Sequence, residues 1–157
     1  YVRLLKEAGT IAEKLNFLRK RYNIVKEENR IFAEWCGKRG VHYADVNILD
    51  HIFDSGGISE PSALAEEMLI PKQTVTNILD RLEKAGYIER VHSKDDRRKI
   101  NVVLLDKGAE FIGEWQKSIN EAEQNLINEI GGGILENMLK DYRRILDITA
   151  KSILKDS

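Results

Sequence analysis

The chain has 157 residues, 42% of them hydrophobic and 32% charged, with a formal net charge of −1. This composition predicts a soluble, helix-rich protein with enough apolar residues for one domain, or for a small domain with dimerisation helices. It excludes a membrane span, because no uncharged apolar run approaches the roughly 18 residues that a span needs. The single cysteine, Cys36, excludes an intrachain disulfide and favours a reducing cytoplasm. Because the chain begins at Tyr1, the sequence leaves open whether a native start or a targeting segment is missing.

A first long helix is predicted from Thr10 to Cys36. Its main stripe alternates spacings of four and three and consists of Ile11, Leu15, Leu18, Tyr22, Val25, Asn29, Phe32 and Cys36. A second stripe beside it consists of Phe17, Ile24, Ile31 and Trp35. Two adjacent stripes imply burial on more than one side. Periodicity alone leaves open whether this is a bundle helix within one chain or a helix shared with a partner.

Two short helices follow a break at Gly37–Gly40. The first runs from Ala44 to Phe53, with Val46, Leu49 and Phe53 predicted to point inward. A turn at Ser55-Gly56-Gly57 separates it from the second, which runs from Ser62 to about Met68. Leu64, Ala65 and Met68 are predicted to be its inward residues.

The next helix is predicted to begin at Pro71, which suits a first helical position, and to end before Gly86. Its apolar stripe consists of Val75, Ile78, Leu79 and Leu82. The opposite face carries Gln73, Asn77, Asp80 and Lys84, with Thr76 and Arg81 on its flanks. Amide side chains match the donor and acceptor pattern of an adenine edge in the major groove. The helix N-terminus, together with Lys72, would favour a nearby phosphate.

A hairpin is predicted after this helix. One strand holds Tyr87, Ile88 and Val91, and its partner holds Ile100, Val102, Val103 and Leu104. The eight residues between them, HSKDDRRK, carry six charges and must therefore form an exposed tip. Residues 71–100 hold eight Lys and Arg against five Asp and Glu, whereas residues 101–157 hold seven against ten. Positive charge is thus concentrated where this helix and hairpin would meet nucleic acid.

Two further helices complete the chain. The first is predicted from Asp106 to Ile130, where Gly131-Gly132-Gly133 stops it. The last is predicted from about Ile134 to Leu154. Neither has a domain of its own to cover, so both must pack on the first helix or on a second chain.

The stretch from Leu64 to Gly108 resembles the MarR (multiple antibiotic resistance regulator) family of winged helix-turn-helix regulators. The resemblance rests on Thr74-Val75-Thr76, on residues 79–86 (LDRLEKAG), on Asp96-Arg97-Arg98, and on Leu104 with Lys107-Gly108. It implies that Asp96 orients the hairpin loop (the wing), that Arg98 enters the minor groove, and that Arg97 contacts phosphate. The chain departs from the family at Leu104-Leu105, where a Leu-Thr pair is usual, so we expect Asp106 to cap the next helix.

The sequence therefore predicts a mainly α protein with a small β-hairpin wing, and the resemblance makes it a dimeric transcription regulator, a repressor by expectation. Its parts would be dimerisation helices at residues 1–38 and 106–157 and a winged helix-turn-helix at residues 41–105. Its partners would be a second copy of the chain and pseudo-palindromic double-stranded DNA. The predicted DNA-binding residues are Lys72, Gln73, Thr74, Thr76, Asn77 and Arg81 on the helix, and Lys94, Asp96, Arg97 and Arg98 on the wing.

The sequence also allows functions other than DNA-binding regulation to be considered. A winged-helix protein-interaction module would use the same fold without DNA, although a neutral or acidic wing would then be expected. A small-molecule effector, which many relatives bind, would lie near a predicted junction lined by Trp35, Arg39, His42 and Tyr43. Cys36 lies on an apolar stripe, which favours a core residue over a redox sensor. The sequence contains no catalytic motif, no cofactor loop and no His or Cys spacing for a metal, so we expect neither enzyme activity nor a cofactor.

Overall fold

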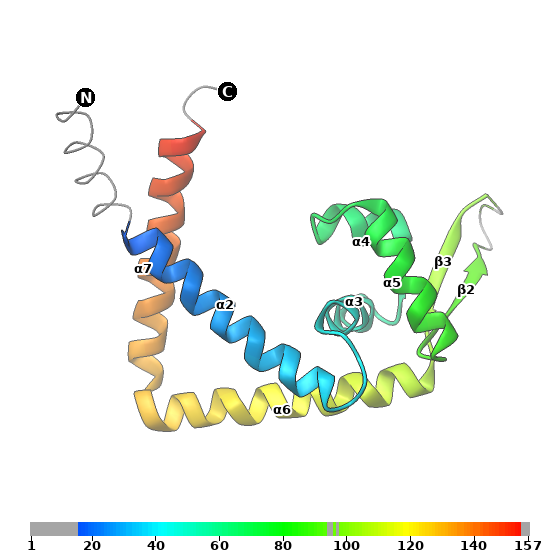
Figure 1. Cartoon of the computed structure of the whole chain (residues 1–157), viewed down its shortest axis with the longest axis horizontal. Helices are drawn as coiled ribbons and strands as arrows, with labels where there is room; N and C mark the ends of the chain where they lie inside the picture. The colour runs from blue at the N-terminus through cyan, green and yellow to red at the C-terminus, as the bar shows by residue number, and fades with distance from the viewer. Residues whose placement is uncertain (1–15, 94–95, 97, 155–157) are drawn as a thin grey trace, which may run out of the picture. The chain divides into compact units, whose positions relative to one another are not determined.

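A computed structural model describes residues 16–93, 96 and 98–154 (Figure 1). Most of these residues are helical, and three short strands form the only sheet in this part of the chain. In chain order the elements are α2 (Asn16–Gly37), α3 (Tyr43–Asp54), β1 (Ile58–Ser59), α4 (Pro61–Glu67), α5 (Lys72–Lys84), β2 (Ile88–His92), β3 (Ile100–Leu104), α6 (Asp106–Ile130) and α7 (Gly132–Ile153). The predicted fold class, mainly α with a β-hairpin wing, is confirmed.

The chain divides into two compact units between Ala109 and Glu110, within α6. The first unit contains the short helices and the sheet, and the second contains most of α6 and all of α7. The predicted three-part division at residues 38–41 and 105–106 stays a prediction. No helix among the described residues is long and apolar enough to cross a membrane.

The core of the first unit is built around α5. All four residues of its predicted apolar stripe are buried, with at most 3% of each exposed. They lie among α3, α4 and β2, whose buried apolar residues are Val46, Ile48, Leu49, Ile52, Leu64, Ala65 and Ile88. The prediction for α3 was wrong at Phe53, which is 38% exposed while Ile52 is buried. The inward stripe of α3 therefore continues from Leu49 to Ile52, a step of three rather than four.

The sheet has the strand order β1-β3-β2, and both pairings are antiparallel. In the wing, Ile88 pairs with Leu104 and His92 pairs with Ile100. The sequence did not reveal β1, because a two-residue strand is too short to show an alternating pattern. The predicted turn before it is present, and Gly57 accepts a hydrogen bond from the Leu104 N–H at 2.9 Å.

Glycine ends α5 as predicted. Gly86 has a φ of 75°, a left-handed conformation that suits glycine. Its N–H donates to the Glu83 carbonyl at 2.9 Å, and the Tyr87 N–H donates to the Leu82 carbonyl at 3.0 Å, which is a Schellman motif. At the other end, Pro71 is the N-cap rather than the first helical residue.

The C-terminal end of α2 and both ends of α6 and α7 lie close to their predicted positions, while the predicted start of the first long helix at Thr10 lies outside the described residues. Asp106 is the first residue of α6. Between α6 and α7 only Gly131 leaves the helical conformation, with a φ of 94°, while Gly132 and Gly133 belong to α7. Three glycines were expected to stop the helix, but a single left-handed residue is enough to end one helix and begin the next.

Candidate nucleic-acid interface

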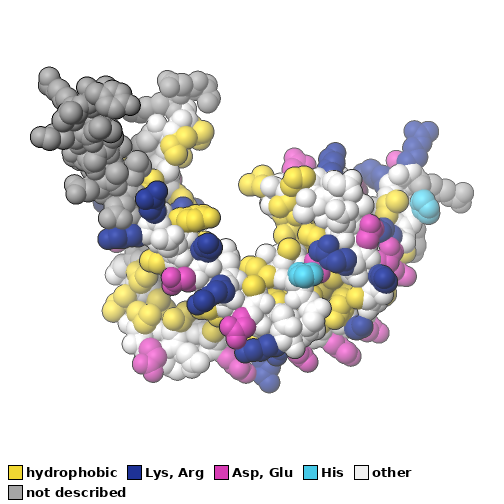
Figure 2. Space-filling model, viewed as in Figure 1, with side chains coloured by type: hydrophobic (Ala, Val, Ile, Leu, Met, Phe, Trp, Pro, Cys, Tyr) yellow, Lys and Arg dark blue, Asp and Glu magenta, His cyan; other side chains and the backbone are white. Residues whose placement is uncertain are grey.

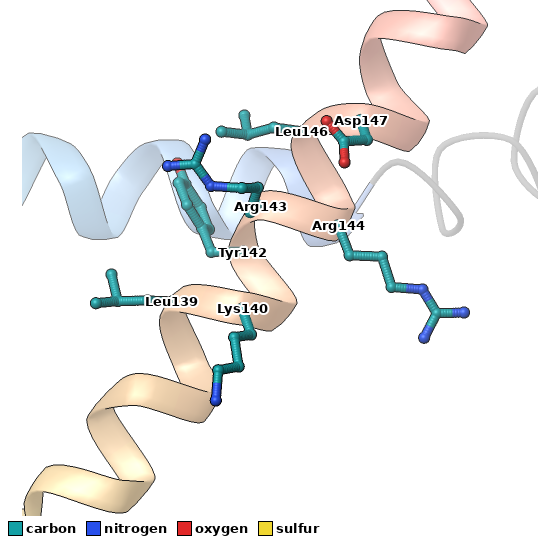
Figure 3. Close-up of a pocket in the computed structure, with 7 residues that line it drawn as sticks. All are labelled: Leu139, Lys140, Tyr142, Arg143, Arg144, Leu146 and Asp147. Atoms are coloured by element: carbon teal, nitrogen blue, oxygen red, sulfur yellow. The ribbon is translucent and has the colours of Figure 1, made fainter.

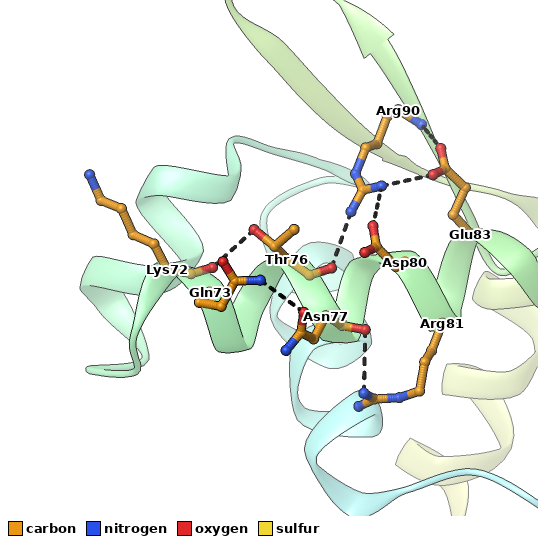
Figure 4. Close-up of polar contacts among 8 residues, drawn as sticks. All are labelled: Lys72, Gln73, Thr76, Asn77, Asp80, Arg81, Glu83 and Arg90. Atoms are coloured by element: carbon orange, nitrogen blue, oxygen red, sulfur yellow. Dashed lines mark hydrogen bonds and ion pairs between the residues drawn. The ribbon is translucent and has the colours of Figure 1, made fainter.

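The exposed face of α5 is polar and carries no acidic residue in its first turn. Lys72, Gln73, Thr74, Thr76 and Asn77 all lie on it and are exposed. Gln73 Nε2 donates a hydrogen bond to Asn77 Oδ1 at 3.0 Å, and Thr76 Oγ1 donates to the Lys72 carbonyl at 3.0 Å (Figure 4). Because the helix N-terminus carries partial positive charge, this end of α5 favours an anion such as a phosphate.

Arg81 holds α5 onto α3. Its guanidinium forms two hydrogen bonds with the carboxylate of Asp45, a contact through Nη2 and a contact from Nε to Oδ2 at 3.3 Å. Asp45 is buried, so this ion pair is partly shielded from water. The hydrogen bond to Asp45 raises the pKa of Arg81. Arg81 Nη1 also donates to the Asn77 carbonyl at 3.3 Å. The side chain predicted to contact phosphate therefore already has a carboxylate partner.

Arg90 of β2 holds the wing against α5. Its Nη1 lies 2.7 Å from Asp80 Oδ1 and 2.9 Å from Glu83 Oε2, and its Nη2 donates to the Thr76 carbonyl at 3.3 Å (Figure 4). The backbone N–H of Arg90 also donates to Glu83 Oε1 at 3.0 Å. Sequence reasoning missed this cluster. A sequence signal for the cluster was present, because Arg90 lies in a strand that directly follows a helix in which Asp80 and Glu83 are one turn apart.

Asp96 organises the turn of the wing. Its Oδ1 accepts a hydrogen bond from the Arg98 N–H at 2.9 Å, and its carbonyl accepts one from the Lys99 N–H at 2.9 Å. These contacts order the backbone of the turn, while the loop-orienting role on DNA that the resemblance implies for Asp96 stays a prediction. Arg98 is exposed. Lys94 and Arg97, the other predicted wing residues, lie outside the described residues.

Two lysines that sequence reasoning did not assign tie the two ends of the wing to neighbouring elements, Lys99 at its tip and Lys107 at its base. Lys99 Nζ lies 3.0 Å from Glu60 Oε1, and the hydrogen bond to Glu60 raises the pKa of Lys99. Lys107 Nζ donates to the Ala85 carbonyl at 2.6 Å and lies 4.6 Å from the centre of the Tyr87 ring. Lys107 therefore satisfies a carbonyl at the C-terminal end of α5, where a cation is favourable.

The position after Lys107 has room only for a glycine, Gly108. A Cβ atom at this position would lie 2.3 Å from the Tyr87 carbonyl oxygen and 2.7 Å from Leu104 Cδ1. Both distances are too short for any side chain, so the start of α6 can approach the wing this closely only with glycine.

Comparison with known proteins gives the same fold. The model of the MarR family matches residues 43–100, which run from the start of α3 to the first residue of β3. The transcriptional repressor YetL of Bacillus subtilis is 31% identical over 88 residues, which are 55% of this chain and 53% of YetL. The transcriptional regulator PrsX of Escherichia coli is 25% identical over 78% of this chain and 69% of its own length. The chain thus spans about half of YetL and about two-thirds of PrsX.

Residues 43–100 of the chain form a MarR-family segment.

Solved structures show the MarR fold beyond the matched segment. A mutant MarR of Escherichia coli complexed with operator DNA superimposes with a TM-score of 0.67 at 22% identity, covering 83% of this chain and 95% of that protein. BldR of Sulfolobus solfataricus gives a TM-score of 0.68 at 23% identity, covering 87% and 96%. The organohalide-sensing regulator RdhR-CbdbA1625, in its 2,4-dichlorophenol-bound form, gives 0.70 at 19% identity, covering 90% and 84%.

The four candidate effector residues lie around the end of α2 and the start of α3. The Arg39 guanidinium lies 3.7 Å above the Trp35 ring, and Arg39 Nη1 donates to the Trp35 carbonyl at 3.3 Å. The Tyr43 ring packs on Phe32 with a centroid separation of 5.4 Å, and His42 is exposed. Arg39 thus covers one face of Trp35, so an aromatic ligand would have to displace it to stack there.

Two surface hollows found among the described residues lie away from this junction. One, of about 500 Å³, is lined only by residues of α7, and Figure 3 shows Leu139 and Leu146 projecting to one side of that helix and Arg144 to another. The other, of about 420 Å³, lies where α4 turns into α5 and is lined by Ser62, Ala65, Glu66, Ile70, Pro71 and Lys72. Neither includes a residue of the predicted effector junction.

Cys36 is fully buried at the end of α2. Burial raises the pKa of its thiol, and the positive charge of Arg39 opposes this only in part. A thiol that stays protonated is a poor nucleophile, so the environment favours the core role over redox sensing.

Proposed function

We propose that this chain is a homodimeric DNA-binding transcription regulator, a repressor that reads a pseudo-palindromic operator. The observation that carries the proposal is the polar, exposed first half of α5 beside a wing turn in which Asp96 orders the backbone of Arg98. Operator DNA is bound by a MarR protein of the same fold. The chain would act in the cytoplasm, and the regulator role involves no catalysis.

In this proposal α5 enters the major groove. Gln73, Asn77 and Lys72 lie at base edges, while Thr74 and Thr76 contact phosphates. Arg98 enters the adjacent minor groove, with Lys94 and Arg97 beside it. Arg81 has a different role from the one first predicted, since it positions α5 on α3 through Asp45. Arg90 likewise fixes the distance from α5 to the wing.

The exposed faces of the long helices support dimerisation. Phe17, Ile24 and Ile31 recur every seven residues on α2 and are each more than half exposed. Leu139, Leu146 and Ile153 recur with the same spacing on α7 and are also exposed. Hydrophobic side chains accordingly lie open on the molecular surface in Figure 2. A seven-residue apolar repeat is typical of helices that pack against another helix.

Two-fold symmetry would place the two copies of α5 in successive major grooves, about 34–36 Å apart. A small-molecule effector would act by favouring a dimer with a different spacing. An effector that favours such a dimer by about 1–3 kcal/mol would weaken operator binding about 5–150-fold. The residues around Trp35 and Arg39 are the proposed place for it, and a chemical class is suggested only by the dichlorophenol that RdhR-CbdbA1625 binds.

The test is the salt dependence of binding to duplex DNA. Affinity of the purified chain for a random duplex would be measured by fluorescence anisotropy between low and physiological salt. We expect log affinity to fall linearly with log salt, with a slope of about −0.9 for each phosphate neutralised. No binding at low salt would contradict the proposal and favour a winged-helix protein-interaction module.

A further inference from the structure

We infer that Gln73 and Asn77 read DNA as one tethered unit, in which Gln73 recognises adenine and Asn77 acts as a hydrogen-bond donor to a neighbouring base. This inference rests on the proposed function and gives it a specific base pattern. Its basis is the hydrogen bond of 3.0 Å from Gln73 Nε2 to Asn77 Oδ1 on the exposed face of α5. Figure 4 shows the two amides facing each other along the helix.

The hydrogen bond between Gln73 and Asn77 determines which polar groups of the two amides remain free to bind a base. Each amide offers two N–H groups and one oxygen. Gln73 uses one N–H on Asn77, so its oxygen and its second N–H remain side by side. That pair matches the amino group and N7 of adenine. Asn77 uses its oxygen on Gln73, and its amide nitrogen has no partner among the described residues. Asn77 therefore presents N–H groups, which match guanine O6 and N7 or thymine O4.

The helix that carries the pair is held on both flanks. Arg81 donates to the Asn77 carbonyl at 3.3 Å while bound to Asp45, and Arg90 donates to the Thr76 carbonyl at 3.3 Å while bound to Asp80 and Glu83. The backbone under the two amides is thus tied to α3 and to the wing. Side chains ordered before binding lose less entropy when they bind.

The spacing of the pair fits two nearby bases. Residues at i and i+4 lie on the same face, about 5–6 Å apart. Bases along one strand are separated by about 3.4 Å. Gln73 and Asn77 would therefore reach bases one or two steps apart, and the bound sequence would contain an adenine close to a guanine or thymine.

The test compares the sequences that variants select from a randomised duplex library. Asn77→Asp keeps the tether, because its carboxylate still accepts from Gln73, but replaces the free N–H groups with acceptors. We expect the adenine preference at the Gln73 position to stay and the Asn77 position to change to cytosine. Asn77→Ala removes the tether, and we expect the adenine preference at the Gln73 position to fall about two- to fivefold.

The converse variant gives a second readout. Gln73→Ala frees the oxygen of Asn77, so Asn77 regains a paired donor and acceptor and its preference should change from guanine or thymine to adenine. Both positions are exposed, and circular dichroism would verify that the variants fold. An unchanged Asn77 preference in Gln73→Ala, or an unchanged adenine preference in Asn77→Ala, would overturn the tethered unit while DNA binding stands. Failure of the unmodified chain to enrich any sequence or to bind any duplex would overturn the proposed function as well.

Discussion

The winged-helix part of this chain (α3 to β3) buries its apolar residues, whereas the long helices α2 and α7 leave many of theirs exposed. In α5 every residue of the apolar stripe is buried. On α7 no residue is buried, and Leu139 and Ile153 are each about 70% exposed. The winged part therefore completes its own core within one chain, whereas the long helices carry apolar surface that a second copy would cover.

The ion pairs of the two regions also differ in whether they join different helices and strands. Arg81 and Arg90 each link α5 to another element of the winged part through carboxylates. In the described part of α2 and α7, ion pairs such as Lys38 with Glu34 and Lys140 with Glu136 join exposed residues one turn apart on a single helix or at its end. Such surface pairs add little stability. The winged part is therefore fixed internally, and association of the long helices should leave its geometry unchanged.

A charge in the apolar stripe of α7 should have the largest effect. Leu139→Glu would bury an unpaired carboxylate in the proposed dimer interface, at a cost of about 3–5 kcal/mol. We expect the dimer dissociation constant to rise by about 140- to 4,000-fold, since each 1.4 kcal/mol is tenfold. Sedimentation velocity would measure the monomer fraction.

Asp141→Lys is the matched control, because this exposed residue lies on another face of α7. It should leave the dissociation constant within about twofold, in keeping with a surface change of at most about 0.5 kcal/mol. If Leu139→Glu leaves the protein as dimeric as this control, the exposed stripe of α7 is not the dimer interface.

Removing the wing arginine should weaken DNA binding without changing association. Arg98→Ala removes two cations from each dimer, and at about 1.4 kcal/mol each the affinity for any duplex should fall about 100-fold. The salt slope should decrease by about 2, one unit for each arginine. Anisotropy titrations at several salt concentrations would measure both. An unchanged slope would mean that Arg98 does not reach the DNA.

Arg90 tests whether the winged part depends on its internal ion pairs. Arg90→Ala removes the partner of Asp80 and Glu83, both of which are partly exposed. We expect a loss of about 1–2 kcal/mol in the free energy of unfolding, measured with urea, because the remaining carboxylates stay partly hydrated. Lys84→Ala, an exposed change on the same helix, should cost at most about 0.5 kcal/mol. Equal losses in the two variants would show that Arg90 does not hold the wing to α5.

The sequence predicted much of this fold because its signals were local. The period of Val75, Ile78, Leu79 and Leu82 identified the buried face of α5, and Gly86 identified its end. The roles of Arg81 and Arg90 were not accessible in this way. Asp45 lies 36 residues from Arg81, and no periodic pattern connects the two. From sequence alone, a charged residue on the flank of a helix is expected to face solvent. Its partner lies on another element and is known only once the packing of the two elements is known.

Cys36 lies one residue before the end of α2, and it gives the smallest expected effect. It is fully buried, whereas Ile31, five residues earlier, is 64% exposed. Burial raises the pKa of the thiol, so the unfolded chain releases this proton at a lower pH than the folded chain does. Folding stability should be unaffected below the ordinary thiol pKa and should fall as the pH rises from that value towards the raised one.

Urea unfolding at pH values of about 8 and 10 would measure this fall in stability, with Cys36→Ala as the variant that lacks the thiol. A stability loss of the same size in Cys36→Ala would assign the pH dependence to other groups, and rapid alkylation of the folded chain at about pH 8 would place Cys36 outside the core.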